Sequence, residues 1–598
     1  MRIISVSVLL AAPLLFAQEA AKPVAGFPEG PRRNAVTPGE FLIDPPTLES
    51  LGFRWYIQGD SNRNAAVAVA YRAKGDPAWK DAQPLLRVHH EIVNQQFSPY
   101  RTGNLFAGSV LFLRPGTGYE VRLTMTDPDG GAPPPKIINV TTRTEPRTPA
   151  GGRTISVSPG RRDFRAAYAE AQPGDTLLFD TGVYRVLDTM RLTKPRIAFR
   201  AVRPGAVIEG AGYRTDLFDI SQADHLTFEG LTFRSARTAL LAGTKNGAGA
   251  SHLTVRNCRI EDVIYGINST SERSEGWYIA DNVILGTNPA WHPRPQAYMS
   301  PAHTGVNVYG RGHVVRRNRI SRFSDSLAIA NFGFLPEDIR MHPVAIDFTD
   351  NDLDWAQDDC LETDYGAHNI RVLRNRCANA HTALSVQPFY GGPVYLIRNE
   401  LYAVTLLAFK IHNYSSGIIA YHNTSATSAT GFQSFDRWQN GHFRNNLILG
   451  GSGVPRPDGQ PRHRYAMSTG SMTPYTTLDY NGYRRNAPGA LIRWFDGKKH
   501  AEYDTLEAFH KATGHEAHGR MVDYDIFVDA VAPRAGTTMH PDQYDLRLRP
   551  GSAAVDAGMP LANINDGFAG RAPDMGAYEL GVPPPVYGPL SQPGGNQP

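Results

Sequence analysis

The sequence predicts an all-β fold in which a right-handed parallel β-helix follows a small β-sandwich, and three observations predict it. The chain carries 57 Gly and 45 Pro among 598 residues, so turns are frequent and long helices are few. Short segments with alternating apolar residues, such as NIRVLRN and PVYLIRN, recur and end in asparagine. Asn351, Asn375, Asn399 and Asn423 are 24 residues apart, and a constant period of this length is typical of a solenoid with one coil per repeat.

The first 17 residues have the features of a secretory signal peptide. Arg2 precedes an apolar run from Ile3 to Phe16, and the small Ala17 follows. The run is too short for a membrane span, and no later segment approaches the length that a span needs. We therefore expect a secreted protein, periplasmic or extracellular, without a membrane span. The formal charge of +4 and the absence of a long Lys/Arg run argue against a nucleic-acid partner.

Residues 36–146 form a first unit of short alternating segments, among them FRWYIQG (53–59) and YEVRLTMTD (119–127). Such alternation predicts antiparallel strands. The stretch LRPGTGYEVRL resembles the fibronectin type III pattern, in which a tyrosine, here Tyr119, makes the corner of the sandwich. The resemblance implies a β-sandwich that serves as a spacer or a docking surface.

Residues 154–450 are the predicted β-helix. Asp163 can cap a short helix whose Phe164, Ala167 and Ala171 share a face, and this helix would cover the exposed edge of the first coil. We expect the recurring asparagines to adopt left-handed backbone geometry and to bond from coil to coil. Longer intervals predict insertions around 287–304 and 332–343. The anchors are Asn257, Asn282, Asn318, Asn351, Asn375, Asn399, Asn423 and Asn446.

Residues 451–580 are predicted to extend and close the solenoid. The segment DLRLRPGSAAVDAGMP resembles the C-terminal end of many secreted bacterial β-helix proteins, which implies that it closes the last coil. The tail from 581 to 598 is rich in Pro and Gly and is expected to be disordered.

The repeat brings acidic residues together. Asp325 lies seven residues after Asn318, and Asp358 lies seven after Asn351, so both are expected in one column on adjacent coils, about 4.8 Å apart. Asp359, Glu362 and Asp364 join them. Two carboxylates about 5 Å apart repel by roughly 3 kcal/mol at an effective dielectric near 20. The cluster therefore needs a bound cation, a shared proton or a basic neighbour.

Two basic residues are available to this cluster. His381 lies six residues after Asn375, one coil further on. Lys410 lies eleven after Asn399, which is the offset of Glu362 two coils away, or roughly 10 Å along the stack. The geometry permits a substrate groove with acid on one side and a base on the other.

The segment QDDCLETDYGAHNIRVLRNRCANAHTALSV resembles the polygalacturonase family. The resemblance implies inverting hydrolysis by three aspartates, Asp325, Asp358 and Asp359, with His381 and Lys410 as a basic pair. It also implies a disulfide between Cys360 and Cys377, which the spacing in an exported chain permits, although both could be small core residues. The chain departs from that family at four positions, namely Phe323, Ala380, Thr382 and Ala408.

The same region resembles calcium-dependent pectate lyases that share the parallel β-helix. That resemblance implies calcium ligands at Asp325, Asp358, Asp359 and Glu362. Lys410 would then abstract the proton α to a uronate carboxylate. We favour the lyase interpretation because Glu362 and Asp364 add charge that a hydrolase does not need and a cation explains. Two alternative interpretations remain: a purely structural calcium site, and a non-catalytic solenoid that binds polysaccharide.

Two aromatic-rich insertions could supply platforms for sugar rings. The candidates for substrate binding are Trp291, Tyr298, Phe389 and Tyr390. Phe389 and Tyr390 could equally cap the core beneath the Gly-Gly turn that follows them. We expect a monomer that binds a polysaccharide, in particular an anionic one.

Overall fold

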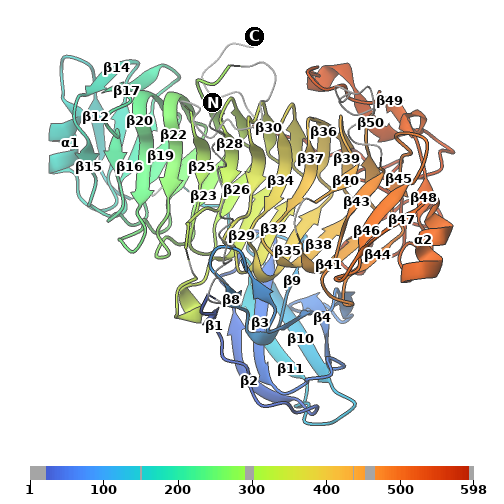
Figure 1. Cartoon of the computed structure of the whole chain (residues 1–598). Coiled ribbons are helices and arrows are strands. Elements are labelled where there is room, and N and C mark those ends of the chain that lie inside the picture. The colour runs from blue at the N-terminus through green and yellow to red at the C-terminus, as the bar shows by residue number, and fades with distance from the viewer. Residues whose placement is uncertain are drawn as a thin grey trace, which may run out of the picture.

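The computed structural model describes residues 22–147, 151–289, 302–333, 335–434, 437–451 and 465–590. The proposed signal peptide lies outside these residues, as do Trp291 and Tyr298. Figure 1 shows one long stack of strands with a smaller β unit beneath its middle. No helix among the described residues is long and apolar enough to cross a membrane.

The long stack is a parallel β-helix, as the period predicts. Its first face, face 1, is a 13-stranded parallel sheet from β12 (Thr154–Val157) to β44 (Thr477–Asp479). Its second face, face 2, runs from β14 (Gly182–Val186) to β48 (Arg520–Met521). Each strand pairs in parallel with the strand one coil further on, for example β30 (Asp352–Asp354) with β33 (Arg376–Ala378). The prediction of a right-handed parallel β-helix is confirmed.

The third face, face 3, positions the acidic residues. It shares the long strands β20 and β22 with face 2, so both faces belong to one continuous sheet. Past β37 the face continues as a small sheet in which β40 pairs with β43 and β43 with β46. Its strands are β15 (Met190–Arg191), β18 (Phe218–Asp219), β20 (Thr232–Gly243), β22 (Arg259–Ser269), β25 (Thr304–Asn307), β28 (Asp325–Ala328), β31 (Asp359–Glu362), β34 (Thr382–Val386), β37 (Leu407–Ile411), β40 (Phe432–Gln433), β43 (Met467–Gly470) and β46 (Ile492–Phe495).

Both ends of the stack carry a short helix. At the N-terminal end, α1 (Phe164–Glu170) begins at Asp163, whose side chain accepts a hydrogen bond from the Arg165 N–H, and its Phe164 and Ala167 are buried. The predicted capping helix is confirmed. At the other end, α2 (Leu506–Thr513) buries Phe509 in the same continuous core (Figure 1). The helices thus cover the apolar ends of the stack.

The asparagine ladder runs inside the solenoid. From Asn282 to Asn446, the side-chain amide of each anchor donates to the amide oxygen of the next, at 2.8–3.1 Å. The ladder continues to Asn481, which sequence reasoning missed. Each buried amide is therefore satisfied by its neighbours.

Two details of the predicted ladder are wrong. Asn257 is not a member, because Cys258 occupies its place and donates its N–H to Asn282 Oδ1 at 2.9 Å. The left-handed residue is the one before each anchor, as at Asp281 (φ 58°), Arg317 (φ 51°) and Asp350 (φ 57°). The turn is made one residue earlier, so that the following asparagine side chain can enter the interior.

Residues 36–141 form two four-stranded antiparallel sheets, which agrees with a β-sandwich. The backbone N–H of Arg114 donates to Tyr119 Oη at 3.0 Å, the contact expected of a corner tyrosine. The likeness to fibronectin type III stays a prediction. One sheet contains β2 (Thr37–Ile43), β3 (Leu51–Gln58), β9 (Asn104–Val110) and β6 (Leu86–His89), and the other contains β11 (Lys136–Thr141), β10 (Gly118–Thr126), β4 (Ala66–Ala73) and β5 (Lys80–Ala82).

The sandwich docks on face 1 through a buried polar interface. Ser109 of β9 donates its N–H to Tyr395 Oη at 2.8 Å, and Arg371 Nε donates to Ser109 Oγ at 3.0 Å. Arg371 also pairs with Asp347 at 2.7 Å, and its side chain is fully buried. A buried ion pair with several hydrogen bonds fixes one orientation of the two units. Tyr395 and Arg371 both lie on strands of face 1.

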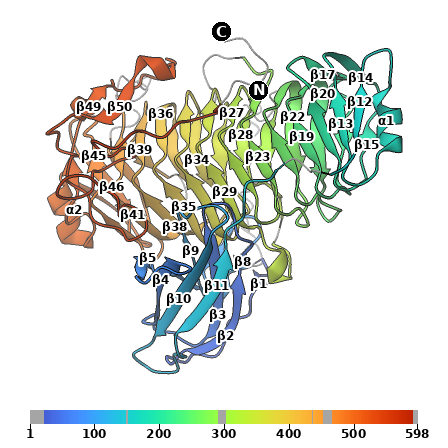
Figure 2. The ribbon, with the colours of Figure 1, turned by 180° about the vertical axis from the view of Figure 1, so that it is seen from behind.

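The C-terminal segment differs from its prediction. Residues 544–578 pack beside face 2, where Tyr544, Leu546 and Met575 share an apolar cluster with Tyr402 and Leu447, and do not close the last coil. Residues 581–590 are ordered. Gly588 N–H donates to Asp350 O at 2.9 Å, and Arg376 lies 5.1 Å from the centre of the Tyr587 ring. Figure 2 shows the red segment crossing the stack. The predicted disorder is thus wrong for these residues, because Tyr587 supplies the anchoring ring.

Candidate functional site

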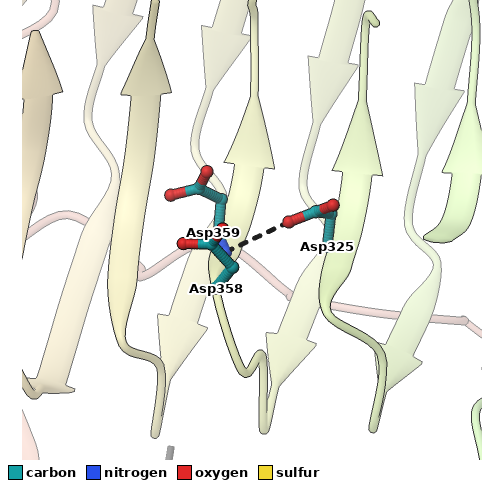
Figure 3. Close-up of side chains that lie close together, drawn as sticks. All are labelled: Asp325, Asp358 and Asp359. Atoms are coloured by element: carbon teal, nitrogen blue, oxygen red, sulfur yellow. Dashed lines mark hydrogen bonds between the residues drawn. The ribbon is translucent and has the colours of Figure 1, made fainter. Parts of the chain in front are cut away.

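The acidic cluster lies where two neighbouring strands of face 3 begin. Asp325 is the first residue of β28, Asp359 is the first residue of β31, and Asp358 directly precedes it. One carboxylate oxygen from each of the three lies within 4.8 Å of the others. Figure 3 shows Asp325 reaching toward the adjacent coil, where its Oδ1 accepts a hydrogen bond from the Asp359 N–H at 3.3 Å. The structure therefore brings these three aspartates together.

The register of the cluster differs by one residue from the predicted register. Leu327 pairs with Leu361 and Ala328 with Glu362, which aligns Asp325 with Asp359 and not with Asp358. The coil that contains Asp358 has one extra residue between β30 and β31. The extra residue moves Asp359 into the position beside Asp325 that an unbroken register would give to Asp358.

Lys410 reaches the cluster from two coils away, as its offset predicts. Glu362 pairs with Ser385 of β34, and Ser385 pairs with Lys410 of β37, so the three share one column. Lys410 Nζ lies 2.8 Å from Asp359 Oδ2 and 3.9 Å from Asp358 Oδ1. The small Ser385 between them leaves the lysine stem free to cross the intervening coil.

Burial and mutual repulsion shift the pKa values of this cluster. Burial, and then Glu362 and the neighbouring aspartates, raise the pKa of Asp325 well above its ordinary range. Burial also raises the pKa of Asp359 to about 6, although Lys410 opposes the shift. Burial alone would lower the pKa of Lys410, but Asp359, Asp358 and Asp364 outweigh it and raise that pKa. The cluster thus favours bound protons or cations.

Glu362 and Asp364 form a second acidic pair beside the triad. Burial raises the pKa of Asp364 to about 7, and burial with the charge of Asp364 raises that of Glu362. Asp364 Oδ1 accepts hydrogen bonds from Ser385 Oγ at 3.0 Å and from the Gln387 N–H at 2.7 Å. The close set of oxygens contains one each from Asp325, Asp358 and Asp359, and Glu362 is not part of it. The predicted role of Glu362 as a fourth ligand stays a prediction.

The triad has the donor chemistry of a site for a hard cation. All three side chains offer carboxylate oxygens, which calcium prefers over nitrogen or sulfur ligands. Asp359 Oδ1 is buried and has no hydrogen-bond partner among the described residues. An orphaned buried carboxylate oxygen is costly unless something binds it. The residues present therefore fit a cation such as calcium.

A disulfide and two histidines flank the triad. Cys360 of β31 is bonded to Cys377 of β33, with 6.1 Å between their Cα atoms, so the bond joins the strand of Asp359 to the next coil. His381 directly precedes β34, and its positive charge would favour ionised Asp359. His303 was not among the candidates, yet its Nδ1 lies 4.0 Å from Asp325 Oδ2 and its ring stacks on Tyr265. The sequence pattern gave no signal that His303 lies near Asp325. The strand register shows it, because the neighbouring Thr304 pairs with Asp325.

Phe389 and Tyr390 are not exposed sugar platforms. Their exposed fractions are 0% and 1%, because Phe389 lies in the solenoid core and Tyr390 packs edge-on against Tyr100. Tyr390 Oη also donates to Gly333 O at 3.2 Å. This corrects the predicted binding role, and the alternative that both residues cap the core is the one observed.

Comparisons with known proteins give only distant matches. No protein-family model matches the sequence, and no curated protein matches it. The PL6 family alginate lyase AlyGC matches with a TM-score of 0.30 and 12% identity over 65% of this chain and 59% of its own. Alginate lyase AlyF-OU02 matches with a TM-score of 0.32 and 12% identity over 66% of this chain and 92% of its own. A tailspike protein mutant of an E. coli bacteriophage, in complex with a pentasaccharide, matches with a TM-score of 0.28 and 12% identity over 57% and 70%.

This chain spans 59% of the length of AlyGC, the first of these structures. At 12% identity the likeness concerns the fold alone. The function is therefore argued from the acidic triad and Lys410.

Proposed function

We propose that this protein is a polysaccharide lyase that cleaves a uronate-containing polysaccharide by metal-assisted β-elimination on face 3. The observation that carries the proposal is Lys410 Nζ, 2.8 Å from Asp359 within a triad of carboxylates. β-Elimination needs a base beside the carbon that bears the uronate carboxylate, and a positive group that holds this carboxylate. The triad, with a bound cation, and the lysine would supply both groups from one patch, which supports the proposal.

Asp325, Asp358 and Asp359 would hold the cation, for which calcium is the proposed ion. When bound, the ion would neutralise the carboxylates and draw electron density from the uronate carboxylate, which makes the proton α to it more acidic. The triad needs such a partner on electrostatic grounds, since burial and repulsion already raise the pKa of Asp325 and Asp359.

Lys410 is the proposed base. Its Nζ is held in place by Asp359, and its side chain is 12% exposed, so it can meet a substrate at the surface while remaining shielded from bulk water. The pKa of Lys410 is raised by Asp359, Asp358 and Asp364, so neutralising these carboxylates is what would allow Nζ to accept a proton. His381, on the coil between Asp359 and Lys410, is the proposed donor to the leaving oxygen.

We also propose where the protein acts and in which oligomeric state. Residues 1–17 would direct export, and the protein would act as a monomer outside the cytoplasm. Hydrolysis by the same aspartates is the competing reaction that the test must separate from elimination.

The test is a panel of uronate-containing polysaccharides followed at the ultraviolet band of unsaturated products, with and without a chelator. The proposal expects chelator-sensitive absorbance that disappears in Lys410→Met and Asp358→Asn. Arg191→Ala is a matched control, because Arg191 lies on the same face at its far end and its side chain is 82% exposed. New reducing ends without absorbance would contradict elimination and assign hydrolysis.

A further inference from the structure

A polar cavity lies on face 3, beyond the acidic cluster. Its volume is about 270 Å³, and its lining includes Gln433, Ser468, Arg437, Arg493, Phe495 and His500. None of the described residues that line it is acidic. It is therefore a basic counterpart of the acidic centre on the same face.

The strand stacking places this cavity at a defined distance from the triad. β31 pairs with β34, and β34 pairs with β37. Ser434, which follows β40, donates its Oγ to Ile411 O of β37 at 2.6 Å, and β40 pairs with β43. Three coil steps of about 4.8 Å separate β31 from β40, so the cavity begins about 14 Å from Asp359 along the face, and β46 lies two steps further, at about 24 Å. Figure 1 shows β37, β40, β43 and β46 following one another.

An aromatic ring and two guanidinium groups shape the cavity. On β46, Trp494 is buried while Arg493 and Phe495 on either side of it are partly exposed. Arg437 lies 5.1 Å from the centre of the Phe495 ring, and the centre of the His500 ring lies 5.0 Å from the same point. An arginine that lies on a ring keeps its planar donors in one orientation, which suits a carboxylate. The ring offers an apolar surface for the C–H face of a sugar.

Gly470 explains why the ring lies so close to the neighbouring strand. A Cβ at Gly470 would come within 2.5 Å of the Phe495 Cβ. The absence of a side chain there lets β43 and β46 approach and leaves the space above them open. The local sequence is therefore consistent with a site built around Phe495.

We propose that this cavity is a remote subsite for a uronate residue of the same polysaccharide chain whose scissile bond lies at the triad. The inference rests on the proposed function for the location of the scissile bond. Arg493 and Arg437 bind the sugar carboxylate, and Phe495 carries the ring. Because Arg493 and Phe495 lie on β46, five coil steps from β31, an oligosaccharide must span about 24 Å to occupy both places, so affinity depends on chain length.

The experiment measures binding of a size series of oligouronates to the full chain carrying Lys410→Met, which prevents turnover. Affinity should rise by at least about tenfold at the length that spans both places, the gain expected of charge-assisted hydrogen bonds. Arg493→Ala should remove that rise and leave the affinity of shorter oligomers unchanged. Arg493→Lys, which keeps the charge and the outward stem, should restore part of it. Arg191→Ala should behave as the parent, and neutral oligosaccharides of equal length should show no rise.

The outcomes separate the two proposals. A rise with length that survives Arg493→Ala and Arg437→Ala, or an equal rise with neutral sugars, overturns the subsite. Elimination by the wild type without any length dependence also overturns the subsite and leaves the lyase proposal standing. A length-dependent rise that Arg493→Ala removes, in a protein that forms no unsaturated product, supports the subsite and contradicts the lyase proposal.

Discussion

Faces 2 and 3 of the solenoid bury aspartates of the same coil in opposite electrostatic surroundings. On face 2, Asp352 lies between Arg376 at 2.9 Å and Arg319 at 3.2 Å. Burial would raise its pKa, but the two arginines outweigh burial and lower it. On face 3, seven residues later in the chain, Asp359 meets two other aspartates and one lysine, and its pKa is raised to about 6.

The difference distinguishes buried charges that stabilise the fold from buried charges that form a candidate site. Asp352 lies between two arginines that compensate its charge, and the asparagine ladder satisfies its buried amides by hydrogen bonds from coil to coil. The triad gathers like charges that cost stability, and such perturbed groups are typical of functional sites. Substitutions of single residues in the triad, in the face 2 column and in the asparagine ladder test this distinction.

The largest effect is expected for Lys410→Met. If Lys410 is the base, kcat for elimination falls by about 10²- to 10⁴-fold, the range for loss of a general base. Initial rates of unsaturated product formation measure it. Unchanged rates would remove Lys410 from the mechanism and end the functional contrast between the two faces.

Arg376→Met is the corresponding change on face 2. It leaves buried Asp352 with Arg319 alone, and breaking a buried pair costs about 3–5 kcal/mol. Urea unfolding should show this loss in the free energy of unfolding, while specific activity at 25 °C is retained. Loss of activity in the folded variant would mean that face 2 is not purely structural.

Asp359→Asn should stabilise the cation-free protein. The folded state holds the Asp359 proton up to a pKa of about 6 against an ordinary 3.8, so the folded state binds more protons than the unfolded state in this window and stability is lost as pH rises through it. Removing the charge recovers about 3 kcal/mol at pH 8, at 1.36 kcal/mol for each pKa unit. Chelator-treated samples unfolded at pH 4 and pH 8 test this. A less stable variant at pH 8 would show that Lys410 makes the aspartate favourable.

Asn375→Ala probes the ladder, where the smallest effect is expected. It leaves the neighbouring amides of Asn351 and Asn399 without one partner each, at a cost of about 1–3 kcal/mol. Thermal unfolding measures the loss, and activity per folded molecule should be unchanged. An unaltered midpoint would show that water replaces the amide.

The sequence predicted the parts of the molecule that repeat. The 24-residue period gave the coils, and the offset from the anchors placed Lys410 in the column of Glu362. It could not give the extra residue before Asp359, because one residue fewer between β31 and β32 compensates for it and the anchors stay 24 residues apart. The sequence also did not predict that residues 581–590 pack against the solenoid. Tyr587 and Gly588 contact a surface that only the folded coils create.

Calorimetric titration of calcium into the chelator-treated protein at pH 8 tests the central claim, that the triad of face 3 exists to hold a cation. The account predicts a site in the wild type whose affinity falls at least about tenfold in Asp358→Asn, because a charged ligand is lost. Asp219→Asn, on the same face at β18, should bind as the wild type does. No calcium binding, or equal binding in all three proteins, would contradict the account.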